Sequence, residues 1–523
     1  MLKLCRPHQA FNYNLLTLMF MVWVVGGCAG QPTTPPVMSL TSEACTTAWQ
    51  DVERQLQQAG IQDAQGNRIP GYPYLRVNRT LADFDLAALS PAERHDWLYH
   101  ALYNGERALR VRLARLEKRH MSDPGWLMHC ATQQVAVLAT DARQWADLVA
   151  NVQVPDAYLD WRRTIGAYPL IRPVLAYQVR RLQASQVNLF AEQTDNAGAR
   201  QFSPGLPEPD AALVTSILGH ERSRDRLGLP VFSREGAEKL LSYHAPHLIM
   251  ATDNPYDRPG TPRWKDSRWV IEPPARAYTL ITQVRWQNQW LPQLVYVFWF
   301  DERPKPHPLD IYGGRLDGLI WRVTLDENGQ VLMYDSVHPC GCYHQWYPLQ
   351  DRLRLNPDAV GDEIMTVLPL RAPDNQQAMS RPIVHLASGT HYVANVSFSP
   401  PPKPITESTP YELIHYDRLR ALPDSKGVYR SLFLPNGLVA GTERLERFLL
   451  WGTGVLSPGA MRQWSHHATA FIGKRHFDDP DLLNRYFEPV QESEGTPGSG
   501  QSNQVHHSRP YQFTPQRPFL TNN

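Results

Sequence analysis

Four residues that could bind a metal or carry out redox chemistry stand at alternate positions of one short stretch. In HPCGCYHQWYP, residues 338–348, single residues separate His338, Cys340, Cys342 and His344. Thiolate and imidazole ligands together favour zinc or copper over calcium or magnesium. Side chains on one face of a strand lie about 6.6–6.8 Å apart, so a straight strand cannot place all four around one ion. The stretch therefore predicts a metal site only if the chain turns here.

Pro339 and Gly341 allow such a turn, because both residue types interrupt a strand and glycine adopts turn conformations freely. A turn would bring Cys340 towards Cys342, so that the stretch supplies two or three ligands. The other ligands would come from histidines elsewhere in the chain, and the candidates are His385, His391, His466, His467 and His476. This interpretation predicts zinc or copper as the bound metal.

Cys340 and Cys342 have two further interpretations that their spacing leaves open. Cysteines in an oxidising compartment usually pair, and these two would close a very small, strained ring that is easily reduced. The pair would then be an inert local disulfide or a working redox pair. The neighbouring histidines favour the metal site, and the sequence does not decide among the three.

A hairpin directly before this stretch must position it. Residues 318–337, GLIWRVTLDENGQVLMYDSV, are two strand-like runs joined at Asn328-Gly329, a preferred two-residue turn in which both residues need positive φ. The turn predicts these opposed pairs: Leu325–Leu332, Val323–Tyr334, Trp321–Ser336, His338–Leu319 and Arg322–Asp335, the last a cross-strand ion pair. His338 then shares the mostly apolar face of the hairpin with Trp321.

The whole chain predicts an α+β fold, with a helical region, then a mainly antiparallel β region, then a mixed region. Ser90 and Glu93 form a capping-box signature before an apolar helical pattern. Strands are expected at 278–286, at 292–300 and as a pair within 381–398. The expected domains are a signal peptide (1–27), a tether (28–40), a helical domain (41–190), a Pro/Gly-rich connecting region with a helix (191–274), an antiparallel β domain carrying HPCGCYH (275–400), a mixed α/β region (401–487) and a disordered tail (488–523).

The amino terminus has the features of a secretory signal. Basic residues precede the apolar run LLTLMFMVWVV at 15–25, which is too short to span a bilayer. The stretch VGGC, ending at Cys28, resembles the lipobox of bacterial lipoprotein precursors. The resemblance implies that residues 1–27 are removed and that Cys28 carries acyl chains such as palmitate. With Ala29 rather than Asp after the cysteine, it also implies an outer-membrane anchor facing the periplasm.

Charge argues against nucleic acid as a partner, and hydropathy argues against a membrane-spanning helix in the mature chain. Lys and Arg number 52 and Asp and Glu number 51, and no basic stripe stands out, so nucleic-acid binding is not expected. No later run approaches the roughly 18 apolar residues of a membrane-spanning helix. The lipid at Cys28 would therefore be the sole membrane attachment.

Cys45 and Cys130 are predicted to form a disulfide. Cys45 begins an apolar helical face that continues with Trp49, Val52 and Leu56. Cys130 lies beside a similar face, and an oxidising periplasm favours pairing.

Two hypotheses for function follow. The first is a lipid-anchored envelope protein with a transition-metal or thiol redox site at His338, Cys340, Cys342 and His344. The second is a non-catalytic envelope scaffold that binds another envelope protein and has structural disulfides only. The sequence contains no nucleophile elbow, phosphate loop or HExxH motif, so it predicts neither a reaction nor a substrate.

Overall fold

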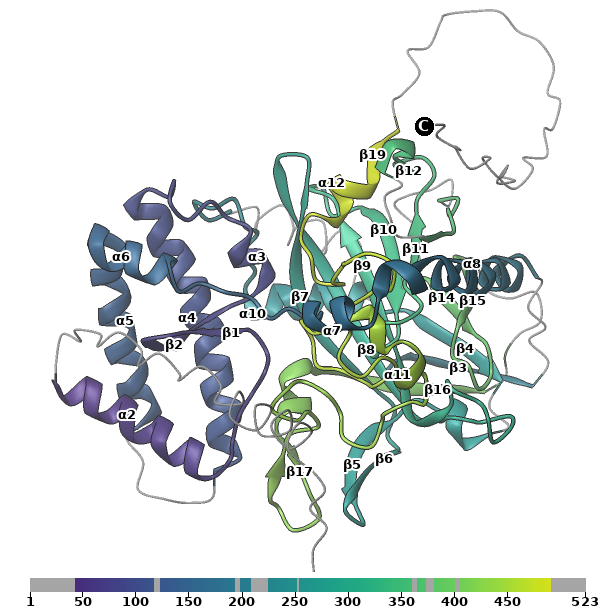
Figure 1. The fold of residues 1–523 in the computed structure, drawn as a ribbon, viewed down its shortest axis with the longest axis horizontal. Helices are drawn as coiled ribbons and strands as arrows, with labels where there is room; N and C mark the ends of the chain where they lie inside the picture. The colour runs from purple at the N-terminus through teal and green to yellow at the C-terminus, as the bar shows by residue number, and fades with distance from the viewer. Residues whose placement is uncertain are drawn as a thin grey trace, which may run out of the picture.

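The computed structural model describes residues 43–116, 123–192, 198–207, 224–251, 254–359, 365–372, 381–399, 405 and 407–490. The predicted signal peptide, tether and Cys28 lie outside these residues, as does the expected tail from residue 491. A helical lobe lies beside a large curled sheet (Figure 1). Helices come first and mixed strands follow, which confirms the predicted α+β class. Among the described helices, none combines the length and apolar character that a membrane crossing requires.

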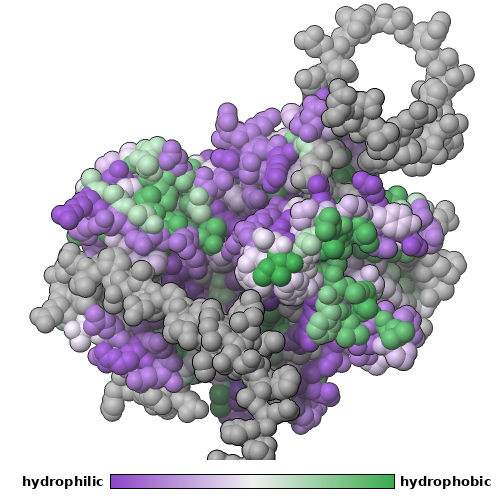
Figure 2. Space-filling view, in the orientation of Figure 1, coloured by the Kyte–Doolittle hydropathy of each residue, from purple (hydrophilic) through white to green (hydrophobic). Residues whose placement is uncertain are grey.

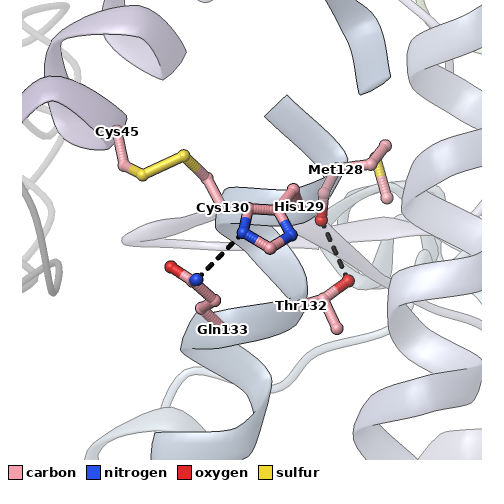
Figure 3. The surroundings of a disulfide bond; sticks show 6 residues. All are labelled: Cys45, Met128, His129, Cys130, Thr132 and Gln133. Atoms are coloured by element: carbon pink, nitrogen blue, oxygen red, sulfur yellow. Dashed lines mark hydrogen bonds between the residues drawn. A yellow bond between two sulfur atoms is a disulfide. The ribbon is translucent and has the colours of Figure 1, made fainter. Parts of the chain in front are cut away.

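The helical lobe is built on amphipathic helices around one apolar core. Its elements are α2 (Glu43–Gln58), β1 (Asn67–Ile69), β2 (Tyr72–Val77), α3 (Arg79–Ala82), α4 (Pro91–Ala114), α5 (Pro124–Thr140) and α6 (Ala142–Val149). The predicted capping box starts α4, with the Ser90 hydroxyl accepting from Glu93 N–H and the Glu93 carboxylate accepting from Ser90 N–H. The predicted disulfide between Cys45 and Cys130 is present and joins α2 to α5 (Figure 3).

The central sheet has eleven described strands and mixes the two strand directions. Their order is β13 (Thr366–Val367), β11 (Gln345–Pro348), β10 (Val331–Val337), β9 (Gly314–Leu325), β8 (Gln289–Arg303), β7 (Arg276–Trp286), β16 (Ser408–His415), β3 (Ala199–Pro204), β4 (His247–Ala251), β14 (Ile383–Leu386) and β15 (Val393–Ser397). The run β7–β8–β9–β10–β11 is antiparallel. Strand β16, the last of these strands in sequence, pairs in parallel with both β7 and β3 and so joins the antiparallel run to a mixed section in which β4 and β14 are also parallel.

Sheet and helices extend across the domain boundaries that the sequence suggested. Strands β3 and β4 belong to the sheet although they lie in the expected connecting region, which also contains α10 (Arg234–Tyr243), capped by Ser233. After α7 (Asp160–Ile165), helix α8 (Tyr168–Ala191) packs against β13 and β15 rather than against the helical lobe. Phe190 of α8 stacks on Tyr347 of β11.

Short elements complete the described chain. They are η1 (Pro255–Asp257), β5 (Thr261–Lys265), β6 (Arg268–Glu272), β12 (Leu353–Leu355), η2 (Pro357–Ala359), η4 (Tyr416–Arg420), β17 (Leu422–Pro423), β18 (Tyr429–Arg430), α11 (Glu446–Leu449), η5 (Trp451–Thr453), α12 (Leu482–Tyr486) and β19 (Phe487–Pro489). Long loops between them cover one face of the sheet and supply several buried polar side chains.

The β9–β10 hairpin confirms most of the predicted register. The pairs Val323–Tyr334, Trp321–Ser336 and Arg322–Asp335 are present, and the last is a buried ion pair. The predicted pair Leu325–Leu332 was wrong, because Leu325 pairs with Val331 and a bulge follows. The turn is wider than expected: the Asp326 carboxylate accepts from Asn328 N–H and Gln330 N–H, and Gly329 has positive φ whereas Asn328 does not. The ladder ends at Val337, so the predicted pairing of His338 with Leu319 does not form.

Candidate functional site

The stretch HPCGCYH forms the loop of the β10–β11 hairpin. His338 N–H donates to the Cys342 carbonyl at 3.0 Å, and Gly341 N–H donates to the His338 carbonyl at 2.7 Å. Gly341 has φ +87°, and a Cβ there would lie 2.3 Å from the carbonyl oxygen of Ala468. Only glycine combines a positive φ with the absence of a Cβ atom that would collide with Ala468. The chain therefore turns where the sequence predicted.

The turn does not bring the four metal-ligand candidates together. His338 Nδ1 lies 3.1 Å from Asp317 Oδ1, whereas His344 Nε2 lies 3.5 Å from Asp335 Oδ2. His344 also packs on Trp346, and burial lowers its pKa to about 4. No group of three or more His, Cys, Asp or Glu side chains in the described parts of the chain is arranged to hold a metal ion. The four residues thus do not form one ligand set.

Cys340 and Cys342 are buried neighbours and carry free thiols. Cys342 N–H donates to the Cys340 sulfur at 3.3 Å, and Arg462 donates to the Cys340 carbonyl. The hydrogen bond with the Cys340 thiol and burial raise the pKa of the Cys342 thiol well above its usual value. The local disulfide, one of the three interpretations left open, is not formed in the structure, and the raised pKa disfavours the thiolate that would drive exchange.

Asp317, from β9, bridges two histidines that are far apart in sequence. Its Oδ1 lies 3.1 Å from His338 Nδ1, and its Oδ2 lies 2.8 Å from His391 Nδ1. Burial alone would raise the pKa of Asp317, but the two histidines outweigh it and hold that pKa well below its usual value. The carboxylate is therefore ionised inside the protein, where it orients both rings.

The surroundings of His391 favour its imidazolium form. Its second nitrogen, Nε2, faces the Tyr256 carbonyl at 3.2 Å and Asp257 Oδ1 at 3.5 Å. Every group at both nitrogens is an acceptor, so both nitrogens must carry protons. Burial alone would lower the pKa of His391, but Asp257 and Asp317 outweigh it and raise it. The Phe300 ring stacks on the imidazolium, with centroids 4.1 Å apart.

The other oxygen of Asp317 orients the ring of His338. Burial lowers the pKa of His338 despite the attraction of Asp317, so the neutral ring dominates at neutral pH. With Nδ1–H donated to Asp317, the lone pair lies on Nε2, which is the arrangement of a general base. The Tyr343 and Tyr392 rings lie edge-on to it, with centroids at 5.0 and 5.6 Å.

Arg303, at the end of β8, completes the rim beside His338. Its guanidinium lies over the rings of Tyr312, Tyr343 and Tyr392, and it donates to the Tyr392 hydroxyl at 3.1 Å. No ion pair between Arg303 and a described carboxylate is within 4.0 Å. Tyr312 is exposed and Tyr343 and Tyr392 are partly exposed, so this rim meets solvent. One guanidinium nitrogen bonds the Tyr392 hydroxyl, and Asp317 and Glu446 interact with the guanidinium electrostatically from beyond ion-pair distance.

Three of the nine non-glycine residues with positive φ in the described chain lie at the same place. Leu316, Tyr343 and His391 have φ of +52°, +62° and +54°, a conformation that side chains rarely adopt. Each adjoins or belongs to the group formed by Asp317, His338 and His391. Such strain costs about 1–3 kcal/mol per residue and collects at functional sites. It is a second observation, independent of charge, that marks this group.

Sequence reasoning found His338 and His391 but missed the residues that connect them. Asp317 could have been found, because it is the one acid in the apolar run of β9. Asp257 and Arg303 gave no such signal. The other histidines considered as ligands have separate surroundings: His385 (Ser397), His466 (the Ala64 carbonyl), His467 (the Trp464 and Phe477 rings) and His476 (Ala157 N–H and Asp156).

This geometry can bind an anion and move a proton. A neutral histidine oriented by a carboxylate stands beside an arginine that makes no ion pair within 4.0 Å with a described carboxylate, and tyrosine rings surround both. Comparison of the chain with protein-family models, with curated proteins and with solved structures finds no match, so no family is assigned and the residues themselves must carry the function.

Proposed function

We propose that this protein is a lipid-anchored cell-envelope protein whose β10–β11 loop forms an acid–base site for a small anionic ligand. In this site Arg303 binds a carboxylate or phosphate group, and His338 takes a proton from the ligand or from water. The observation that carries the proposal is the bridge from Asp317 to His338 and His391. It leaves His338 as the neutral, oriented base.

The choice of an anionic ligand rests on charge. Arg303 is the cation whose N–H donors face the rim: it makes no ion pair within 4.0 Å with a described carboxylate, although Asp317 and Glu446 attract it from further away. A guanidinium presents several parallel N–H donors that match carboxylate and phosphate oxygens. The tyrosine rings around it suit a ligand with an apolar or aromatic body.

The envelope location rests on two features. The VGGC stretch at Cys28 resembles a lipobox, and the disulfide Cys45–Cys130 is of the kind that persists in oxidising compartments. The variant Cys28→Ser should leave the membrane fraction, with Ala29→Ser as the matched control that stays. Recovery of Cys28→Ser in high-salt-washed membranes would contradict the anchor.

The site is tested by separating binding from turnover. Small carboxylates and phosphate monoesters would be screened by calorimetry, and their chromogenic esters by hydrolysis rate. Arg303→Gln should weaken anion binding about tenfold or more, because a charge-assisted hydrogen bond is lost. His338→Gln should lower turnover about 10²–10⁴-fold with binding little changed. The control His385→Gln alters an equally buried histidine outside the site.

The pH profile adds a second readout. Burial lowers the pKa of His338 below its ordinary 6.5, so the neutral base form persists into mildly acidic solution. Turnover should therefore begin to fall only when the pH drops below 6.5. If no ester is cleaved and neither variant changes anion binding, the non-catalytic scaffold is the better description.

Thiol redox chemistry at Cys340 and Cys342 is a second candidate function. The contact between Cys342 N–H and the Cys340 sulfur favours it, since the two thiols need little movement to pair. Their burial and the raised pKa of Cys342 oppose it, because thiolate attack needs an accessible, ionised sulfur. We therefore rank it below acid–base chemistry.

A further inference from the structure

One face of the protein exposes large apolar side chains that the proposed function does not use. The most exposed are Ile165 of α7, Leu170 of α8, and Phe448 and Leu449 of α11, each more than 60% exposed. Trp161, Val174, Tyr177 and Leu445 are also exposed, and we call these eight residues the α7–α8–α11 face. Figure 2 shows hydrophobic side chains gathered over these three elements. Apolar patches of this kind mark interaction surfaces.

The face is continuous because η5 joins its parts. Trp451 of η5 lies against Trp161 of α7, with ring centroids 6.0 Å apart. The backbones of Gly166 and Gly452 also meet: a Cβ on Gly166 would lie 2.7 Å from the Cα of Gly452. Since α11 immediately precedes η5, the three helices present their apolar side chains side by side (Figures 1 and 2).

Helix α8 is apolar on two sides. Its inner side packs against β13 and β15, and Phe190 stacks on Tyr347. Its outer side carries Leu170, Val174 and Tyr177 at spacings of four and three, which is one stripe of a helix. The inner contacts already hold the helix in place. The outer stripe is therefore left for something outside the described chain.

The charges on this face select an anionic occupant. Helix α8 contains three arginines and no Asp, Glu or Lys. Helix α7 adds Arg162 and Arg163, and its single acid, Asp160, is paired with Lys474. The Arg162 guanidinium lies over the rings of Trp161 and Trp451. Arginine beside exposed Trp, Tyr and Leu is the composition of helices that lie in the headgroup layer of a membrane.

We infer that the α7–α8–α11 face docks on the surface of a bilayer that contains anionic phospholipid. The lipid surface is preferred over a protein partner because the proposed anchor at Cys28, on which this preference rests, keeps a bilayer within reach. The 15 residues from Cys28 to Ser42 extend to at most about 50 Å. A lipid anchor and a basic apolar face together give stable attachment where one acyl signal alone is reversible.

Docking there would place the acid–base site next to the bilayer. Helix α11 points Phe448 and Leu449 outwards, while its Glu446 is buried and interacts electrostatically with Cys342 and Arg303. Glu446 N–H also donates to the carbonyl of Ile311, the neighbour of the rim residue Tyr312. The same short helix therefore carries part of the docking face and part of the wall of the site.

Vesicle binding tests the inference without the anchor. A chain from Ala29 to Asn523 keeps every described residue and has no acylated cysteine. It should co-float with vesicles of phosphatidylcholine and phosphatidylglycerol, bind pure phosphatidylcholine weakly, and be released by salt. The triple variant Leu170→Ser, Val174→Ser, Phe448→Ser should bind about tenfold less or worse. The control Tyr99→Ser, Leu206→Ser, Val231→Ser changes exposed residues elsewhere and should bind as the parent does.

Three results would overturn the inference. One is that the parent chain fails to bind anionic vesicles, and another is that the triple variant binds them as well as the parent. The third is a parent chain that sediments as a dimer and becomes a monomer in the triple variant, since a second copy would then cover the face. The tested chain lacks Cys28, so vesicle binding does not depend on whether the lipid anchor exists. The ligand-binding and turnover assays likewise do not depend on whether the face docks on a bilayer, so failure of one proposal can be told from failure of the other.

Discussion

The helical lobe and the loop-covered face of the sheet are stabilised in different ways. The lobe buries mainly apolar side chains, and the disulfide Cys45–Cys130 joins its helices α2 and α5. Around the β10–β11 loop, by contrast, ionisable side chains are buried among strained backbone, with Asp317, His338 and His391 at the centre. Buried charge is a poor source of stability. The difference is the one expected if the loop carries the proposed acid–base site and the lobe contributes mainly stability.

The largest effect should come from breaking the charge bridge. Asp317→Asn leaves the His391 imidazolium with one carboxylate and turns an amide donor towards the ring, so it should lower the free energy of unfolding by about 3–5 kcal/mol. In the lobe, Asp51→Asn removes an exposed ion pair with Arg54 and should cost about 0.5 kcal/mol or less. Urea unfolding measures both. Equal losses would mean that the bridge is not the charged centre described here.

Adding His391→Gln to Asp317→Asn sharpens this test. If the two residues act as a unit, the double variant should lose clearly less than the sum of the single losses. Additive losses would show that the two side chains act independently.

The next effect belongs to the lobe. Replacing Cys45 and Cys130 with Ala should cost about 2–5 kcal/mol, because the unfolded chain regains freedom over the 85-residue separation. Guanidinium unfolding of the variant should show the lobe melting first, while turnover at the site is unchanged below that transition. Free thiols at both positions in periplasm-derived protein would contradict the disulfide.

The two regions also differ in how far the sequence could predict them. Lobe features are local: the capping box at Ser90 and the apolar face that carries Cys45 can be read within a few residues. The hairpin register was local as well, although the Asp326 side chain widened the turn in a way that Asn328-Gly329 alone did not signal. Local chemistry therefore predicted the fold class and the β7–β10 and β14–β15 strands, but not β3, β4 or β16.

The site depended on contacts that no local pattern encodes. Asp317 and His391 are 74 residues apart, and they meet because the sheet brings the β14–β15 turn to the start of β9. The spacing of His338 and His344 suggested a shared ligand, yet the two rings contact different carboxylates, Asp317 and Asp335. The residue types of HPCGCYH pointed to the loop that contains the candidate site. The tertiary contacts of its histidines, with two different carboxylates, favour acid–base chemistry over the metal site that the spacing suggested.

A smaller effect concerns the two thiols. Cys340→Ala and Cys342→Ala should each cost about 1 kcal/mol, the ordinary cost of a core substitution. Thiol titration of native protein should find Cys340 and Cys342 reduced, and elemental analysis should find no stoichiometric zinc or copper that depends on them. Metal that is lost on these changes and retained on His307→Gln would restore the metal-site hypothesis. A Cys340–Cys342 bond in native protein would support the redox candidate.

The smallest effect is a pH dependence of stability that belongs to His391. Its pKa in the folded protein is raised above the ordinary 6.5, so its contribution is complete below pH 6.5 and is lost as the pH rises through the raised value. Asp317, whose pKa is lowered, contributes above its ordinary 3.8 and does not titrate in this window. His338, with a lowered pKa, acts in the opposite direction and destabilises the fold as the pH falls. The total pH dependence therefore mixes both signs, and only a comparison of variants isolates His391.

Unfolding free energies at about pH 6 and about pH 8.5 should provide that comparison. The parent protein should lose more stability between these two values, or gain less, than His391→Gln, because only the parent loses the imidazolium. His385→Gln is the control. His385 is buried with a lowered pKa and forms no ion pair with a carboxylate among the described residues, so its removal should not reproduce the effect. If the parent and His391→Gln respond equally to pH, His391 is neutral in the folded protein. The bridge through Asp317 would then orient His338 with a neutral hydrogen bond instead of a buried charge.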